Sequence, residues 1–355
     1  MSDSRNNVLL AMSGGVDSSV AAKLLLDQGY AVTGVFMCLG SAGRGGEAVR
    51  GCCSPTDAAD ARRVADALGI DLFVLNFEDV FAPIIDDFLH QYALGRTPNP
   101  CIHCNSQIKF GRLLERADQL GVAFVATGHH ARIVHADGRA AIARGRAGGK
   151  DQSYALFAVA RSALPRMLLP IGEMADKAGV RAIARDLGLS IHDKPDSQEV
   201  CFVPDDDFAA LLRTRLPEAM RSGDIVDATG KVLGQHDGYA QFTIGQRRGL
   251  RVAASVPLYV TAIDPATATV TLGPREALLG TCLTASRANW HRDVPAEFAA
   301  IVQIRYNHRG APARVRLTGE DTFEVNFDQS VSAITPGQAA VVYDGDTLLG
   351  GGWID

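Results

Sequence analysis

A short apolar segment followed by two glycines, an acid and two serines is the feature that most constrains the fold. Residues 8–20 read VLLAMSGGVDSSV. Val8 to Met12 has the pattern of a buried parallel strand, and a helix is expected to open at Ser18. Gly14 and Gly15 permit a sharp turn that brings backbone N–H groups close to an anion, which the helix dipole also favours. The segment therefore predicts a strand, a phosphate-binding turn and a helix.

The polar side chains of this turn suit a nucleotide phosphate chain. Ser13, Ser18 and Ser19 offer hydroxyl donors, and the carboxylate of Asp17 suits a Mg²⁺ ion that bridges phosphates. The lysine of a Walker A loop is missing, because G-x-x-x-x-G-K-[ST] occurs nowhere in the chain. Phosphoryl transfer of the usual P-loop kind is therefore not indicated. A Gly/Ser turn that only caps a helix is the plainer alternative, which the strand–turn–helix context disfavours.

Residues 13–18 resemble the SGGxDS loop of the N-type ATP pyrophosphatases, the PP-loop superfamily. The resemblance implies cleavage of ATP between the α- and β-phosphates, adenylation of a carbonyl oxygen and release of pyrophosphate. Met37 and Gly128 follow or end predicted strands beside this loop, where ligands of parallel sheets bind. The expected nucleotide-binding residues are Ala11, Met12, Ser13, Gly14, Gly15, Val16, Asp17, Ser18, Met37 and Gly128.

Composition fits an ordinary globular protein of two or three domains. The chain has 355 residues, of which 47% are hydrophobic and 21% charged. No apolar run approaches the ~18 residues of a transmembrane helix, and the N-terminus, MSDSRNN, does not resemble a secretory signal. We therefore expect a cytoplasmic protein without membrane partners, in which the seven cysteines are thiols, metal ligands or catalytic groups.

Charge alone does not indicate a nucleic-acid partner, since the formal net charge is −5. Local groups of basic residues at 144–150, 247–251 and 305–316 make phosphate contact a reasonable hypothesis, although such groups are usually just solvated surface.

Strands and helices alternate in the first half, which predicts an α/β fold with a parallel sheet. The expected strands are 8–12, 31–37, 72–76 and 123–127, and the expected helices are 56–68, 80–94 and 105–120, with a Pro-rich loop at 95–104. Residues 153–215 are expected to be helical, and from Gly223 short strands and turns predominate. The predicted domains are a PP-loop catalytic domain (1–215), a small β-rich domain (216–282) and a C-terminal β-barrel (283–355).

Two thiols lie at C-x-x-C spacing where the Pro-rich loop meets a helix. Such a position lowers the pKa of Cys101 and Cys104 and favours a reactive thiolate. A third thiol, Cys201, lies in DSQEVCF. Read alone it is a small buried residue, but beside an adenylating site a thiolate or persulfide can replace AMP.

Two other uses of the cysteines are weaker hypotheses. The adjacent pair Cys52 and Cys53 could join Cys101 and Cys104 in a zinc site, but the spacing is not that of a zinc ribbon. No metal site of this kind is predicted. Cys38 and Cys282 lie in apolar strand-like segments and are expected to pack.

The chain resembles the tRNA-specific 2-thiouridylases, which install sulfur at position 2 of the wobble uridine. The resemblance covers nearly the whole chain in the family's order. It comprises SGGVDSS, GRTPNP with Cys104, residues 105–110, ATGH at 126–129, KDQSY at 150–154, residues 196–202, TIGQRRGL at 243–250, Arg305-Tyr306 and TPGQ at 335–338.

This resemblance implies an ATP- and Mg²⁺-dependent sulfurtransferase. Asp17 belongs to the catalytic set, Cys104 is the nucleophile, and Cys201 carries a persulfide from a sulfur-relay donor. Cys104 attacks that persulfide, sulfur displaces AMP from the adenylated uridine, and a Cys104–Cys201 disulfide remains. Asn99, Pro100 and Cys101 are expected at the target base. The expected tRNA contacts are His129, Lys150, Asp151, Gln152, Arg305, Tyr306 and Gln338.

Alternatives remain at this point. Many family members have Asp at the position of Cys101, so its role is open; Cys101, Cys104 and Cys201 could instead hold a [4Fe–4S] cluster. We favour the persulfide relay because a C-x-x-C pair with one distant cysteine is a weak cluster signal. Another PP-loop tRNA-modifying or amide-forming synthetase, or a non-catalytic tRNA-binding or metal-storage protein, is the rival function.

Overall fold

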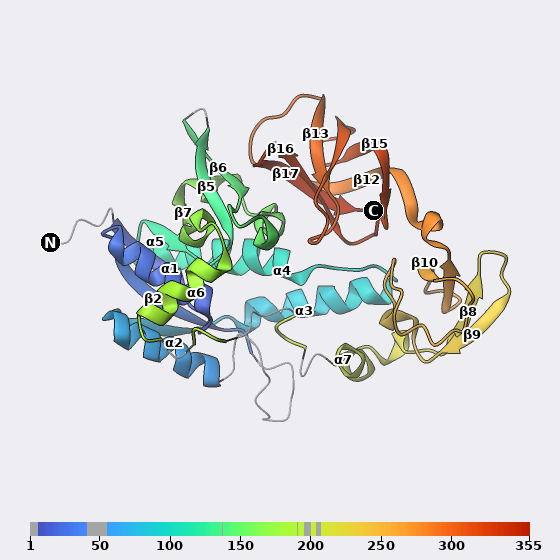
Figure 1. Cartoon of the computed structure of the whole chain (residues 1–355), viewed down its shortest axis with the longest axis horizontal. Coiled ribbons are helices and arrows are strands. Elements are labelled where there is room, and N and C mark those ends of the chain that lie inside the picture. The colour runs from blue at the N-terminus through green and yellow to red at the C-terminus, as the bar shows by residue number, and fades with distance from the viewer. Residues whose placement is uncertain (1–5, 41–54, 137, 190, 195–199, 204–206) are drawn as a thin grey trace. The chain divides into compact units, whose positions relative to one another are not determined.

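The computed structural model describes residues 6–40, 55–136, 138–189, 191–194, 200–203 and 207–355 (Figure 1). These residues form two compact units, which are described separately. The first comprises the chain up to Ile84, Cys101–Asp206 and Asp346–Leu349. The second comprises Ile85–Pro100, Asp207–Gly345 and Gly350–Asp355.

A five-stranded parallel sheet organises the first unit, in the order β3-β2-β1-β4-β7. Its central strand pairs on both sides, since Val8 lies opposite Val32 on β2 and Phe124 on β4. This strand is apolar and buried over its last four residues, as expected where helices cover both faces. The strands are β1 (Asn7–Ala11), β2 (Ala31–Cys38), β3 (Leu72–Asn76), β4 (Phe124–Ala126) and β7 (Met167–Leu168).

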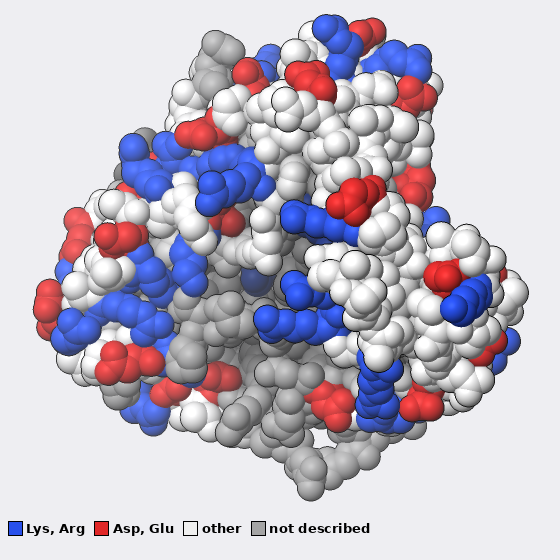
Figure 2. All heavy atoms as spheres, turned by 45° about the vertical axis from the view of Figure 1, so that its right-hand side comes forward, with Lys and Arg blue, Asp and Glu red and all other residues white. Residues whose placement is uncertain are grey.

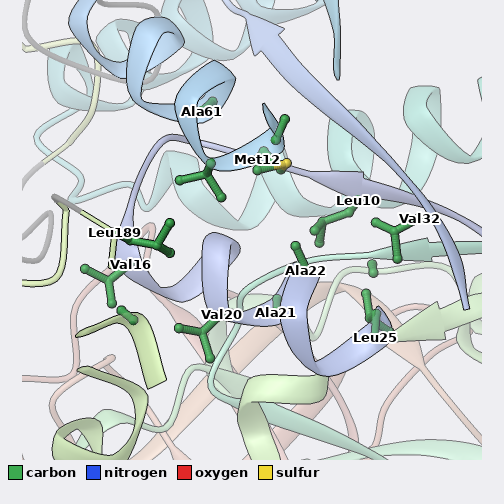
Figure 3. Packing of buried hydrophobic residues seen from close by; sticks show 14 of the residues in the cluster. Leu10, Met12, Val16, Val20, Ala21, Ala22, Leu25, Val32, Ala61 and Leu189 are labelled. Carbon is green, nitrogen blue, oxygen red and sulfur yellow. The ribbon is translucent and has the colours of Figure 1, made fainter. Parts of the chain in front are cut away.

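Helices α1 (Val16–Asp27), α2 (Pro55–Leu68) and α6 (Lys177–Asp186) share one core with this sheet. Figure 3 shows Leu10 of β1 near Ala22 of α1; Met12, which directly follows β1, belongs to the same buried cluster, as do Val20 and Leu25. This packing fixes α1 directly after β1, so the turn between them is held at the carboxyl end of the central strand. The predicted strand–turn–helix is confirmed, with the helix beginning at Val16, two residues before the expected Ser18.

A helical segment crosses the two cysteines of the C-x-x-C pair. It runs as α4 (Pro100–His103), a π-helix (Cys104–Arg112) and α5 (Leu113–Gln119). The expected loop at 95–104 is therefore too long, because the helix starts at Pro100, whose fixed φ suits a first helical position. The expected helix at 105–120 is present, but its first half has π geometry.

The expectation of a helical region at 153–215 is only partly correct. Short 3₁₀ turns occupy Ser153–Leu156, Arg161–Arg166 and Pro170–Glu173, and β7 adds a strand to the sheet. The helices α6 and α7 (Phe208–Arg215) are present. The preceding hairpin was not expected: β5 (Ala131–Ala136) pairs with β6 (Arg139–Arg144). In α3 (Glu78–Ala93), an interior proline, Pro83, does not end the helix.

The second unit contains a small four-stranded sheet in the order β10-β11-β8-β9. Its strands are β8 (Gly223–Asp227), β9 (Val232–His236), β10 (Tyr259–Asp264) and β11 (Thr269–Gly273). The last part of α3 belongs to this unit, where the ring centroids of Phe88 and Phe208 of α7 lie 5.8 Å apart.

A β-barrel ends the chain. Neighbouring strands follow the order β12-β15-β14-β13-β16-β17, and β12 also pairs with β17, for example Ala285 with Ile354. This last pairing closes the barrel. The strands are β12 (Leu279–Trp290), β13 (Glu297–Gln303), β14 (Ala311–Leu317), β15 (Phe323–Ser332), β16 (Ala339–Asp344) and β17 (Thr347–Ile354). The predicted α/β fold with a parallel sheet, a β-rich part and a terminal barrel is confirmed.

Candidate active site

The turn between β1 and α1 is held by its own serines. Ser18 and Ser19 are buried, and their hydroxyls donate to the carbonyl oxygen of Gly15 at 3.1 and 2.8 Å. The backbone N–H of Ser13 lies 3.3 Å from the Ser18 hydroxyl. Gly14 has a φ of +71°, and Gly15 caps α1 in an extended conformation. The loop is therefore held by its own hydrogen bonds, and Ser13 is its exposed hydroxyl.

Asp17 lies in the first turn of α1, close to the side chains of Lys177 and His130. Lys177 Nζ, at the start of α6, donates to both carboxylate oxygens at 2.6 and 2.7 Å. His130 Nε2 lies 3.2 Å from Oδ1, within ion-pair range, although it does not form a hydrogen bond there. Burial alone would raise the pKa of Asp17, but the contacts with His130 and Lys177 outweigh it and lower the pKa. Asp17 is therefore ionised at neutral pH and suited to a Mg²⁺ ligand.

The segment after β4 packs directly against the start of α1. A Cβ at Gly128 would lie 2.7 Å from Ser18 N, so only glycine permits this approach. The next residue, His129, is buried, and its Nδ1 lies 2.7 Å from the hydroxyl of Thr127. Burial, with the nearby charges of Lys109 and His130, holds the pKa of His129 well below its usual range. Its imidazole is therefore neutral at physiological pH.

Lys194 holds the loop through the backbone carbonyl of Gly14. Its Nζ donates to Gly14 O at 3.1 Å, to Asp60 Oδ2 at 2.8 Å and to the carboxylate of Asp57. Burial would lower the pKa of Lys194, but the contacts with Asp57 and Asp60 outweigh burial and raise it. Burial would raise the pKa of Asp60, but its contacts with Lys194 and Arg63 outweigh burial and lower it. These residues form a charged support under the phosphate loop.

The residues 150–152, which were predicted to contact tRNA, mostly form hydrogen bonds within the first unit. Asp151 accepts hydrogen bonds from Arg144 Nη1 at 2.7 Å and from the backbone of Gly145 and Ser153. The side chain of Gln152 accepts from the backbone N–H of His130 at 2.9 Å. Asp151 and Gln152 therefore order the loop that holds His130, while Lys150 is partly exposed.

The three cysteines of interest differ in exposure: Cys104 is buried, Cys201 is half-buried and Cys101 is exposed. Among the described residues, no three His, Cys, Asp or Glu side chains lie together as a metal site would require. The three thiols therefore do not converge in this structure. Cys52, Cys53 and residues 196–199 of the 196–202 segment lie outside the described residues. The packing expected for Cys282 is wrong, because it is exposed on β12.

In the second unit, the predicted tRNA residues of the barrel hold neighbouring loops. Arg305 Nη2 donates to Ile244 O at 2.6 Å and to the hydroxyl of Thr335. Gln338 Nε2 donates to Thr97 O at 2.7 Å, two residues before Asn99. Tyr306 is exposed, Asn99 is half-buried and Pro100 is buried.

Three family models together match almost the entire chain. The tRNA methyl transferase HUP domain matches residues 6–205, the tRNA methyl transferase PRC-barrel domain matches 209–274, and the aminomethyltransferase beta-barrel domain matches 280–354.

Full-length relatives are named for one activity. The tRNA-specific 2-thiouridylase MnmA of Carboxydothermus hydrogenoformans is 49% identical, with 99% of this chain and 98% of the relative aligned. The MnmA protein of Geotalea uraniireducens is 47% identical over 99% of this chain and 95% of its own. The chain belongs to the tRNA-specific 2-thiouridylase family. The amide-forming synthetase and the non-catalytic binding protein are therefore set aside.

Three residues that contact the β1–α1 loop were not predicted from the sequence. Lys177 and Lys194 bring ammonium groups to a loop that has no lysine of its own, and His130 places its imidazole beside Asp17. The missing Walker lysine was the available signal, because a phosphate site without an internal cation needs one from elsewhere. They lie far from Asp17 and Gly14 in the sequence, so no local pattern indicates the contacts.

Four further predicted nucleotide-binding residues are buried in the first unit. Ala11, Met12 and Val16 are buried around the loop, and Met37 is buried near the end of β2.

Within the described part of the chain, no helix is both long enough and apolar enough to cross a membrane.

Proposed function

We propose that this chain is an ATP-dependent tRNA sulfurtransferase that forms 2-thiouridine at the wobble position. The observation that carries the proposal is the 49% identity, over 99% of the chain, to a protein named for this activity. A formed phosphate loop with an ionised Asp17 supports it independently. The expected products are 2-thiouridine, AMP and pyrophosphate.

For the nucleotide half of the reaction, the loop N–H groups and the start of α1 would receive the ATP phosphates. Asp17 fits a Mg²⁺ ion, which would neutralise the pyrophosphate leaving group when bound. We propose that Lys177, which donates to the Asp17 carboxylate, turns to a phosphate oxygen when ATP binds. The roles of Met37 and Gly128 at the adenosine remain those predicted from their places at strand ends.

For the sulfur half, Cys201 would carry the persulfide and Cys104 would be the nucleophile. The Cys104 thiolate attacks the Cys201 sulfur, a Cys104–Cys201 disulfide forms, and hydrosulfide leaves. Hydrosulfide then adds at C2 of the adenylated uridine and AMP departs. The sulfane sulfur is reduced by two electrons as the two thiols are oxidised, so a thiol reductant must reopen the disulfide. An exposed Cys101 is consistent with a place at the base rather than in a cluster.

For tRNA binding, basic residues of the described surface are available. Figure 2 shows that lysine and arginine side chains gather in several groups on one face. In the second unit, Arg247 and Arg248 are exposed on the loop that Arg305 holds. We propose that such residues contact tRNA phosphates, while Arg305 and Gln338 keep their loops in place. The sulfur-relay donor and the cytoplasmic location remain predictions.

The direct test of the function is nucleoside analysis of tRNA from a strain that lacks the gene. We expect 2-thiouridine derivatives to disappear from wobble positions and to return with the wild-type gene. Return with an Asp17→Asn variant, or no loss on deletion, would contradict the proposal.

A further inference from the structure

The helical segment that carries Cys104 has an unusual pattern of buried residues. Cys104 and Ile108 are buried four residues apart, the next buried aliphatic residue, Leu113, follows after five, and Ala117 after four more. In a continuous α-helix, Leu113 would point about 180° around the axis from Cys104. The structure resolves this conflict with a π-helix over Cys104–Arg112, in which Leu113 N donates to Ile108 O.

Gly111 makes this π geometry possible. A Cβ at this position would lie 2.8 Å from Ser106 O, the carbonyl five residues earlier. Real Cβ atoms do not approach backbone oxygens so closely, so any other residue would force the turn to open. Glycine is therefore required at position 111 because the backbone of the same helix passes so close, and not because the helix ends there.

Ser106 supports the change from α4 to the π-helix. Its hydroxyl donates to Ile102 O at 3.0 Å, and His103 O lies 3.3 Å away as a second acceptor. A change in hydrogen-bond spacing weakens the backbone pairing of carbonyls at the junction, and a serine hydroxyl can satisfy them. The Ser106 side chain thus stabilises the turn immediately after Cys104.

The segment is fixed to its surroundings on both sides of Ser106. Asn105 Nδ2 donates to Ala155 O at 3.0 Å in a buried site, and the ring of Phe110 lies 6.3 Å from that of His129. With these anchors in place, a return to α geometry cannot be absorbed by rotation of the whole helix. It must turn Cys104 and Ile108 relative to Leu113.

We propose that the π-turn built by Ser106 and Gly111 sets the direction of the Cys104 thiol for sulfur transfer. The two residues are then positioning residues of the thiolation step and take no part in adenylation. This inference rests on the proposed function, in which Cys104 is the nucleophile.

The test compares Gly111→Ala with Gly179→Ala in purified full-length enzyme. Gly179 lies inside α6, and its added Cβ would meet only side-chain atoms, at 3.2 and 3.4 Å. We expect Gly111→Ala to slow 2-thiouridine formation about 100-fold, the order of loss that a displacement of about 1 Å produces. Its tRNA-dependent release of pyrophosphate in the first turnover, which reports adenylation alone, should stay within about threefold of wild type, and Gly179→Ala should change neither rate.

A second readout follows the thiol itself. Alkylation by iodoacetamide, read by peptide mass spectrometry, should change at Cys104 relative to Cys101 in Gly111→Ala. If that variant does not fold, Ser106→Ala provides the same test with a smaller loss, and Ser106→Thr, which keeps the hydroxyl, should restore thiolation. Wild-type thiolation by folded Gly111→Ala or by Ser106→Ala would overturn the inference, as would an equal loss of first-turnover pyrophosphate release.

Cys104→Ser separates the two levels of the proposal. An inactive Cys104→Ser beside a fully active Gly111→Ala would overturn only the positioning role. Thiolation by Cys104→Ser would instead show that the proposed sulfur route is wrong.

Discussion

Lys177 donates two hydrogen bonds to the carboxylate of Asp17, 160 residues earlier in the chain, at 2.6 and 2.7 Å. The pair brings a cation to a phosphate loop that contains none. The contact also joins the first turns of α1 and α6, which pack in the same core.

Replacement of Lys177 by Met should abolish AMP formation while the fold persists. The folded pKa of Asp17 lies below its unfolded value, so its contacts stabilise the protein above about pH 4 and lose this effect as pH falls through the folded pKa. The difference in melting temperature between wild type and Lys177→Met should therefore be constant from pH 7 to pH 5 and shrink under more acid conditions. A difference that grows in acid would contradict the assigned pairing.

Replacement of Lys194 by Met should destabilise the loop, because it leaves the carboxylates of Asp57 and Asp60 without their shared partner. We expect a loss of about 1–2 kcal/mol, since the ammonium group is partly exposed. Thermal unfolding at pH 7 measures this loss, and Lys194→Arg is the matched control that keeps the charge. A variant as stable as wild type that binds ATP normally would show that the support is dispensable.

The cysteine roles predict a separation between the two half-reactions. Cys104→Ser and Cys201→Ser should each lose 2-thiouridine formation, because serine can neither carry a persulfide nor form the disulfide. Both should still release pyrophosphate in the first turnover with tRNA, because pyrophosphate leaves at adenylation, whereas AMP leaves only when sulfur displaces it. Cys101→Asp should remain active, and anaerobically purified enzyme should thiolate tRNA without iron; activity that tracks iron content would reverse this assignment.

Arg305 offers a test of phosphate contact against loop support. An arginine on a phosphate should lower the salt slope of tRNA affinity by about one when replaced by Ala. We expect that change for Arg248→Ala, which removes an exposed side chain. Arg305→Ala should weaken binding with a smaller change in slope, because its guanidinium holds Ile244 and Thr335. Binding titrations at several salt concentrations decide between the two, and equal slopes for both variants would refute the distinction.

The fold was predictable where sequence period and burial agree. The expected helix at 56–68 matches α2 within one residue, because its buried residues Ala61, Val64 and Ala65 recur at helical spacing. The expected strand at 72–76 matches β3, although Phe73 and Val74 of this apolar run are exposed. Region 153–215 was misjudged since its buried residues pack in 3₁₀ turns and a two-residue strand, too short to show a period. The β5–β6 hairpin was missed, since its strands mix alanines with charged residues and show little alternation.

The part of the site that is formed by consecutive residues was predictable from the sequence. The loop at 13–18 contains its own turn and hydroxyl contacts, so the motif is visible in the sequence. Lys177 and Lys194 reach it only through the packing of distant segments, which no local pattern records. The π-helix that starts at Cys104 is visible in the sequence as the five-residue spacing between the apolar residues Ile108 and Leu113. A search for the α-helical period alone treats this spacing as an irregularity.

The central claim is that ATP cleavage by this chain activates the wobble uridine for sulfur. The most direct measurement incubates purified enzyme with unmodified tRNA, ATP, Mg²⁺ and a persulfide donor. It then quantifies AMP and, by mass spectrometry of the digested tRNA, 2-thiouridine at the wobble position. We predict that both form in equal amounts and that neither forms with Asp17→Asn. AMP release without 2-thiouridine, or 2-thiouridine without ATP cleavage, would contradict the account.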